Sequence, residues 1–168
     1  MAGIMEKELV PSEQTYADLV VKGSKIEEFL RKWITGVMAG LSELDEKTAK
    51  MILKKAGEDC CKLFLETYGL DLNSRDLDSL IEWWNKRPAS RCYKEDENTI
   101  IYEFKSNKCE CLLVEKGFVN LTPKLCSVCF TNWLEYMFGT VAKRKTEAEL
   151  IESLATGTSK CSFRIKLL

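Results

Sequence analysis

Four cysteines in the second half of the chain have a spacing that could hold a metal. Cys109 and Cys111 are one residue apart, fourteen residues follow, and Cys126 and Cys129 are two residues apart. Thiolates are the soft ligands of zinc and iron–sulfur clusters. On a strand the first pair would share a face, and at a helix start the dipole would favour thiolates in the second pair. The spacing therefore predicts a zinc or iron–sulfur site at Cys109, Cys111, Cys126 and Cys129.

Two other roles for these cysteines stay open. Free cysteine is among the most buried residue types, and Cys126 and Cys129 fall on a helical stripe with Phe130, Trp133 and Met137, so they could be small core residues. A C-x-x-C pair could also be a redox dithiol, although no thioredoxin-like βαβ pattern precedes it.

Three of the other four cysteines, Cys60, Cys92 and Cys161, are predicted to pack in the interior. Cys60 falls on the apolar stripe of its helix, whereas Cys61 lies at the edge of that stripe and could approach the four-cysteine site. Cys92 and Cys161 are isolated on predicted strands, where core packing is the default for a cysteine.

Histidine is absent from the chain, which excludes Ser-His-Asp and Cys-His hydrolases. Any catalysis would need a carboxylate, thiolate, lysine, tyrosine or bound metal. Glu110 and Glu135 lie closest in sequence to the cysteines, but glutamates are mostly solvated surface groups. The sequence identifies no catalytic residue.

The first half of the chain has the pattern of helices. A capping box at Ser24 and Glu27 precedes a stripe from Ile26 to Met38 with three- and four-residue spacing. A second helix is predicted from Asp45 to Tyr68, with Gly69 as its stop and a stripe through Ile52, Ala56, Cys60, Leu63 and Tyr68. A third follows Ser74 and ends before Pro88, and a weaker one covers Ser12 to Val21.

The second half has the pattern of short strands around one helix. Arg91 to Tyr93, Thr99 to Phe104 and Cys111 to Val114 are strand-like runs. Glu147 to Leu154 could be a helix by composition, but Gly157 and the β-rich ending from Cys161 to Ile165 favour a hairpin. Thr122 and Pro123 open a helix that is predicted to stop at Gly139. Helices followed by a sheet with one inserted helix define the α+β class. We expect one domain over 1–168, helical in 1–87 and sheet-forming in 88–168.

Composition limits the partners and the compartment. The net charge is −1, from 25 basic and 26 acidic residues, which argues against a nucleic-acid-binding surface. No stretch approaches the ~20 apolar residues of a membrane helix, and Met1 to Val10 lacks the apolar run of a signal peptide. We therefore predict a cytoplasmic protein without membrane contact, whose eight cysteines are thiols or metal ligands rather than disulfides.

The second half resembles the 4-vinyl reductase-like domains and the related L-2-amino-thiazoline-4-carboxylic acid hydrolases. The likeness covers about residues 88–168, and its most recognisable part is the ending Gly157-x-x-x-Cys161-x-Phe163-x-Ile165. It implies a helical layer on an antiparallel sheet whose last two strands form a hairpin, with Val141 to Leu154 as the first of them. It also implies a domain that binds or senses a small molecule.

The leading hypothesis is therefore a binding module for a small apolar ligand. Its pocket is expected to lie beside the metal and to be lined by Trp33, Trp83, Trp84, Phe104 and Trp133. The alternative is a metal- or thiol-dependent hydrolase of thiazolines or cyclic amidines. A sensor without an output domain would have to act through a partner or as a homodimer.

Overall fold

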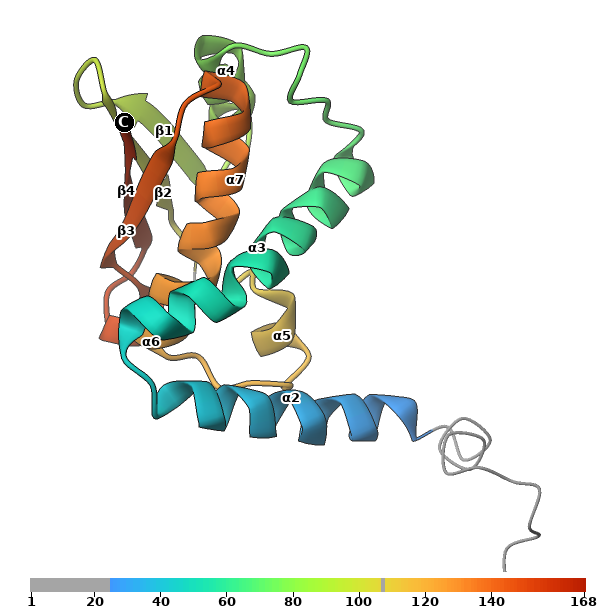
Figure 1. Cartoon of the computed structure of the whole chain (residues 1–168). Helices are drawn as coiled ribbons and strands as arrows, with labels where there is room; N and C mark the ends of the chain where they lie inside the picture. Colours follow the sequence, from blue (N-terminus) through green and yellow to red (C-terminus); the bar gives the residue numbers. More distant parts are fainter. Residues whose placement is uncertain (1–24, 107) are drawn as a thin grey trace, which may run out of the picture.

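The computed structural model describes residues 25–106 and 108–168 and has the α+β architecture expected from the sequence (Figure 1). Helices occupy the N-terminal part and a four-stranded antiparallel sheet the C-terminal part, with strand order β1-β2-β4-β3. A helical segment lies between the second and third strands in sequence. The predicted fold class is confirmed.

Three helices come before the sheet. They are α2 (Ile26–Ser42), α3 (Glu46–Tyr68) and α4 (Leu77–Asn85). The side chain of Asp45 caps α3, and Asp76 forms a reciprocal cap with Ser79 at the start of α4. The predicted helix over 12–21 and the Ser24 cap lie outside the described residues.

The strands are β1 (Ser90–Lys94), β2 (Thr99–Phe104), β3 (Thr146–Glu152) and β4 (Cys161–Leu167). Strands β3 and β4 pair as the predicted hairpin, although β3 is shorter than the stretch 141–154 that the resemblance implied. The short 3-10 helix η2 (Leu154–Thr156) joins them.

The segment between β2 and β3 is mostly helical. Its elements are α5 (Leu112–Glu115), α6 (Pro123–Leu125), the π-helical turn η1 (Cys126–Phe130) and α7 (Thr131–Ala142). The predicted start at Thr122 and Pro123 is confirmed. The predicted stop at Gly139 is wrong, because α7 continues for three more residues. A Cβ at Gly139 would lie 2.9 Å from the Thr146 hydroxyl, so glycine there serves close packing of β3 on the helix.

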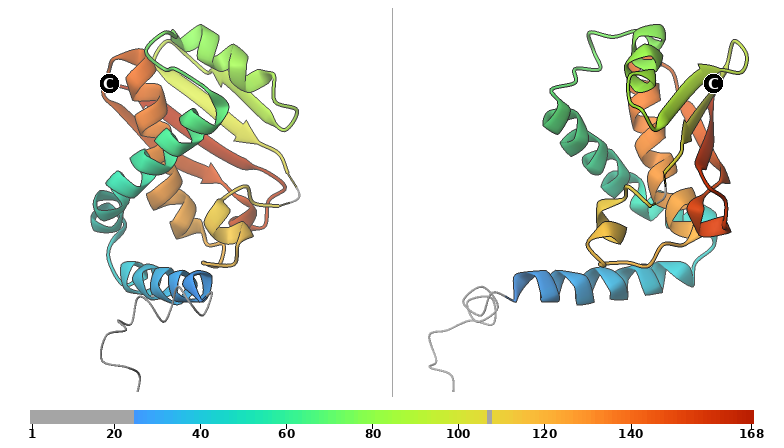
Figure 2. Two further views of the ribbon diagram at one scale, coloured as in Figure 1. Left: turned by 90° about the vertical axis from the view of Figure 1, so that its right-hand side faces the viewer. Right: turned by 180° about the vertical axis from the view of Figure 1, so that it is seen from behind.

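Helices cover one face of the sheet in two layers (Figures 1 and 2). Helices α4 and α7 pack directly on the strands, and α3 crosses over α7 and η1. Helix α2 lies across one end of the molecule, beneath α5 and α6 as drawn in Figure 1. None of the described helices is both long enough and apolar enough to cross a membrane.

Buried side chains form two separate groups. We call the larger one the sheet core; it lies between the strands and helices α4 and α7 and includes Trp84, Tyr102, Cys126, Trp133 and Phe163. We call the smaller one the helix core; it joins α2, α3 and η1 through Leu41, Ala49, Leu53 and Val128.

The buried face of α3 differs from the prediction. All five residues of the predicted stripe are exposed, and the buried residues follow one position later: Ala49, Leu53, Gly57 and Cys61. A Cβ at Gly57 would lie 2.8 Å from Asn132 Cβ and 2.9 Å from the Cys129 carbonyl oxygen. Helix α3 therefore turns its small residues toward α7 because the backbones come close there.

Candidate functional site

Cys109 and Cys111 lie on a loop rather than on the predicted strand. The run after Cys109 turns into helix α5, and Cys111 is the residue that precedes its first turn. The backbone N–H of Cys111 donates to the Cys109 sulfur at 3.4 Å. The strand prediction failed because four apolar residues in a row fit a short helix as well as a strand.

Cys126 and Cys129 lie on the π-helical turn η1. Thr122 caps the preceding turn by accepting from the Leu125 N–H at 3.2 Å. In a π turn the backbone bonds span five residues, so residues three apart are splayed relative to an α-helix. As a result, Cys126 packs in the sheet core, whereas Cys129 packs against the helix core. The single stripe predicted for these two cysteines is wrong.

The four cysteines nevertheless lie in one neighbourhood. Burial raises the pKa of Cys126 to about 12, and the thiols of Cys161, Cys109 and Cys111 add to the shift. Burial also raises the pKa of Cys129 to about 12, with Cys111 as the strongest neighbouring contribution. Cys111 is thus an electrostatic neighbour of both cysteines of η1.

Two further thiols join this group from distant parts of the chain. Burial raises the pKa of Cys60, and Cys111 adds to the shift, so α3 contributes a thiol beside the C-x-C loop. Burial likewise raises the pKa of Cys109, where the Cys111 N–H opposes the shift and Cys161 adds to it. We call Cys60, Cys109, Cys111, Cys126, Cys129 and Cys161 the thiol group.

The thiol group contains two cysteines that are not among the four predicted metal ligands: Cys60 on α3 and Cys161 on β4. Cys60 is exposed and faces the group, and it is Cys61 that is fully buried, which reverses the expectation for this pair. Cys161 is half-buried at the start of β4. Cys92 is buried on β1, as predicted.

The chemistry of the thiol group suits a soft metal, but its geometry is not that of a closed site. Sulfur donors are those that zinc and iron–sulfur clusters prefer. Among residues 25–106 and 108–168, no three cysteine, aspartate or glutamate side chains are grouped so as to hold one ion. Several thiols would have to rotate toward one another, and to lose protons, before they could share a metal.

The two candidate acid–base carboxylates are both paired. Glu135 Oε1 accepts from Lys50 Nζ at 2.7 Å and from the Ala148 N–H at 2.8 Å, which ties α7 to α3 and β3. Glu110 Oε2 lies 3.6 Å from Arg87 Nη2. The Arg87 guanidinium in turn packs on aromatic rings, with 5.2 Å between its Cζ and the ring centre of Trp84. Both carboxylates therefore connect elements of the fold.

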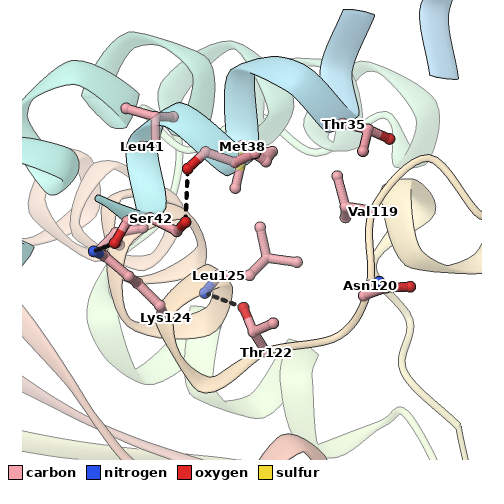
Figure 3. Close-up of a pocket in the computed structure, with 11 residues that line it drawn as sticks. Thr35, Met38, Leu41, Ser42, Val119, Asn120, Thr122, Lys124 and Leu125 are labelled. Atoms are coloured by element: carbon pink, nitrogen blue, oxygen red, sulfur yellow. Dashed lines mark hydrogen bonds between the residues drawn. The ribbon is translucent and has the colours of Figure 1, made fainter. Parts of the chain in front are cut away.

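A cavity of about 230 Å³ lies between α2 and the segment that leads into η1 (Figure 3). Helix α2 and the segment 119–128 supply its walls, which are mostly apolar. The lining residues are Thr35, Met38, Ala39, Leu41, Ser42, Val119, Asn120, Thr122, Lys124, Leu125 and Val128.

Polar bonds hold the two walls of the cavity together. The Thr35 hydroxyl of α2 donates to the Phe118 carbonyl oxygen at 2.8 Å. Lys124 Nζ donates to the Ser42 carbonyl oxygen at 2.8 Å (Figure 3). It also donates to the Leu44 carbonyl oxygen. The charge of Lys124 is thereby directed at the end of α2, where it also suits the helix dipole.

The aromatic residues predicted to line a pocket do not line this cavity. Trp84, Trp133 and Phe104 are buried in the sheet core, and Trp33 is 60% exposed on α2. None of the five predicted aromatic residues lines the cavity. The lining of the cavity could not be predicted, because it joins two segments about 80 residues apart whose small and aliphatic residues carry no motif. Two of the lining residues had a local signal: Met38 on the helical stripe and Thr122 as a helix cap.

Comparisons with known proteins give weak likenesses. No protein-family model and no curated protein matches the chain, so the resemblance to 4-vinyl reductase-like domains stays a prediction. One similar solved structure is a trafficking protein particle complex subunit 3 from Naegleria fowleri covalently bound to palmitic acid. It is 12% identical, with a TM-score of 0.46 over 84% of this chain and 95% of that one.

Two other solved structures are similar at the same level. The phenol-responsive sensory domain of the transcription activator PoxR, solved with phenol, is 10% identical, with a TM-score of 0.48 over 85% of this chain and 73% of that one. A structure from work on H-NOX activation is 17% identical, with a TM-score of 0.41 over 76% of this chain and 69% of that one. Such likenesses concern the chain fold and assign neither ligand nor activity.

Proposed function

We propose that this protein is a sensor-type module that binds a small, largely apolar molecule in the cavity between α2 and the segment 119–128. The cavity is the observation that carries the proposal. Its walls combine aliphatic side chains such as Met38, Leu41 and Val119 with the polar groups of Thr35 and Asn120. Apolar walls with a few polar groups are typical of small-molecule sites.

The size and charge of the cavity narrow the class of ligand. About 230 Å³ lies between the ~150 Å³ cavity that takes up benzene and the ~300 Å³ at which natural ligand sites begin. Lys124 is the charged side chain among the described lining residues, and its ammonium already donates to two carbonyl groups. We therefore expect a neutral ligand the size of one aromatic ring or a short acyl chain, oriented by a hydroxyl or amide partner.

Filling the cavity from α2 tests this proposal. Ala39 is exposed on α2 yet lines the cavity, so Ala39→Phe should occupy the space with little effect on folding. Ala56→Phe is the matched control, because Ala56 is an exposed alanine on α3 that does not line the cavity. Calorimetric titration with single-ring compounds and short fatty acids should show binding to the wild type and the control but not to Ala39→Phe. Equal binding by all three would refute the proposed site.

We propose in addition that Cys109, Cys111, Cys126 and Cys129 bind zinc or an iron–sulfur cluster. The proximity of Cys111 to Cys109, Cys126 and Cys129 favours this second candidate. When bound, the metal would crosslink the C-x-C loop to η1, whose Val128 also lines the cavity. The hydrolase alternative has no such support, because Glu110 and Glu135 are both engaged in pairs.

Elemental analysis and a visible spectrum of anaerobically purified protein test the metal. We expect about one zinc, or the sulfur-to-iron absorption of one cluster, per chain, and its loss in Cys111→Ala and Cys129→Ala. Cys92→Ala, which removes a buried thiol outside the thiol group, should keep the metal. Metal-free wild-type protein would exclude the site without bearing on the cavity.

A further inference from the structure

Helix α2 has two apolar sides, and within the described chain only one of them packs against the helix core. On this inner side, Met38 packs against the helix core and the Thr35 hydroxyl donates to the Phe118 carbonyl oxygen. Leu41, at the C-terminal end of α2, is buried in the helix core. On the other side, four large residues stay exposed at a spacing of four, three and four positions. They are Ile26, Leu30, Trp33 and Val37, with exposed fractions of 49%, 38%, 60% and 39%.

That spacing places the four residues on one stripe of the helix. It is also the apolar spacing by which one helix packs along another. Contiguous exposed apolar residues of this kind mark interaction sites more often than scattered ones do. We call Ile26, Leu30, Trp33 and Val37 the outer stripe.

Two glycines beside the outer stripe point to a second helix as its partner. Gly36 follows Trp33 by three residues and Gly40 follows Val37 by three, so each lies next to the stripe. Glycine destabilises the interior of a helix, so a glycine at such a position calls for a packing explanation. Gly57 has such an explanation, since a Cβ would clash with α7, but a Cβ at Gly36 or Gly40 would meet nothing within 4 Å among residues 25–106 and 108–168.

Glycines four residues apart make a flat site where another helix backbone can approach closely. Within the described chain nothing occupies that site. The glycines and the outer stripe together therefore fit a helix that comes from outside the described chain.

We propose that the partner is a second copy of this chain, whose α2 packs antiparallel on the outer stripe across a two-fold axis. The bulky residues Ile26, Leu30 and Trp33 lie in the N-terminal half of the face, and Gly36 and Gly40 lie in its C-terminal half. Antiparallel pairing brings the bulky half of each copy onto the glycine half of the other. The face is thus complementary to itself, as a two-fold interface requires.

The position of α2 permits this pairing. Helix α2 lies across one end of the molecule, away from the sheet, so a second copy can approach it there (Figure 2). Opposed helix dipoles also favour the antiparallel arrangement. A single helix pair is smaller than a standard interface of roughly 800 Å² per partner, so we expect a reversible dimer of micromolar affinity.

Sedimentation equilibrium from low to high micromolar concentration, in reducing buffer, tests the proposal with two variants. Trp33→Glu places a charge in the outer stripe, and Gly36→Leu blocks the close approach. Each should raise the dimer Kd by at least about tenfold. Met51→Glu is the matched control, because Met51 is 69% exposed on α3 outside the face, and it should dimerise like the wild type.

Gly36→Leu separates loss of the dimer from loss of the fold. Leucine forms helix better than glycine, and nothing in the described chain obstructs it, so helix content by circular dichroism should be retained or increased. Wild-type protein that stays monomeric at every concentration, because another part of the same chain covers the face, would overturn the proposal. A dimer that both variants leave intact would also overturn it.

Discussion

Asn85 connects the end of α4 to β1 through both ends of its side-chain amide. Its Nδ2 donates to the Cys92 carbonyl oxygen at 2.8 Å, and its Oδ1 accepts from the Cys92 N–H at 2.7 Å. Strand β1 lies at the edge of the sheet, with β2 as its neighbour. The Asn85 side chain thus makes the two hydrogen bonds that a further strand would make with Cys92. It thereby covers part of the exposed edge of β1, where another chain could otherwise pair.

Replacing Asn85 with alanine should therefore destabilise the protein. Both backbone groups of Cys92 would lose a partner in a half-buried position, which costs about 2 kcal/mol of unfolding free energy. Chemical denaturation measures the loss. The matched control is Asn98→Ala, an exposed turn position, which should change stability by less than about 0.5 kcal/mol. Equal stability of the two variants would contradict the role of Asn85.

The buried thiol of Cys92 should be unreactive in the folded protein. Burial raises its pKa to about 12, so at pH 8 it remains protonated, and the thiolate is the reactive form. Iodoacetamide at pH 8 should label the exposed Cys60 and spare Cys92, as read by peptide mass spectrometry, and unfolding in guanidinium should expose both. Labelling of the two at the same rate in native protein would show that β1 opens readily.

The same thiol makes a pH-dependent contribution to stability. The pKa of Cys92 is higher in the folded state than the ~8.5 of a free cysteine, so the folded state holds its proton longer. Its stabilising contribution is complete below pH ~8.5 and is lost as the pH rises toward 12. Replacing Cys92 with alanine should flatten the alkaline fall in stability.

At the scale of elements, α3 shows what periodicity can and cannot predict. Its start at Asp45 and its end at Gly69 follow from capping chemistry and are confirmed. Its buried face could not be predicted from the spacing of apolar residues. The stripe with the larger apolar residues is exposed, and the stripe with Gly57 and Cys61 is buried. Close approach to α7 requires small residues, and that requirement is tertiary.

Gly57→Ala tests this explanation against helix propensity. Alanine is the better helix former by about 1 kcal/mol, yet its Cβ would lie 2.8 Å from Asn132 Cβ and press on the Cys129 carbonyl. We expect a net loss of about 1–3 kcal/mol in unfolding free energy, from overpacking. Ala56→Gly, exposed one position earlier, should lose about 1 kcal/mol by propensity alone. A gain in stability from Gly57→Ala would mean that α3 and α7 are not in close contact.

The element η1 explains why the cysteine site was only partly predictable. The types and positions of Cys109, Cys111, Cys126 and Cys129 are plain in the sequence, and the structure brings them into one neighbourhood. The π turn that directs Cys126 and Cys129 to different cores has no sequence signal, because the shift in backbone bonding depends on the packing around it. Whether these thiols hold a metal stays a prediction.

At the scale of the whole molecule, the α+β order and several helix caps could be derived from local patterns, whereas the first strand of the closing hairpin followed only from the family resemblance. The way in which distant segments pack against one another could not be derived. Both the proposed ligand cavity and the outer stripe depend on that packing. One side of α2 forms a wall of the cavity, and another side carries the outer stripe. Helix α2 is therefore the element through which a bound ligand could influence the pairing of two copies.

If a small neutral molecule occupies the cavity beside α2, methyl NMR will locate it residue by residue. Titration with the tightest-binding single-ring compound should shift the methyl signals of Met38, Val119 and Leu125 along one saturating curve. The methyl signals of Leu134 and Met137, fully buried in the sheet core, should stay in place. Shifts confined to the sheet core, or none in the cavity at saturating ligand, would contradict binding in this cavity.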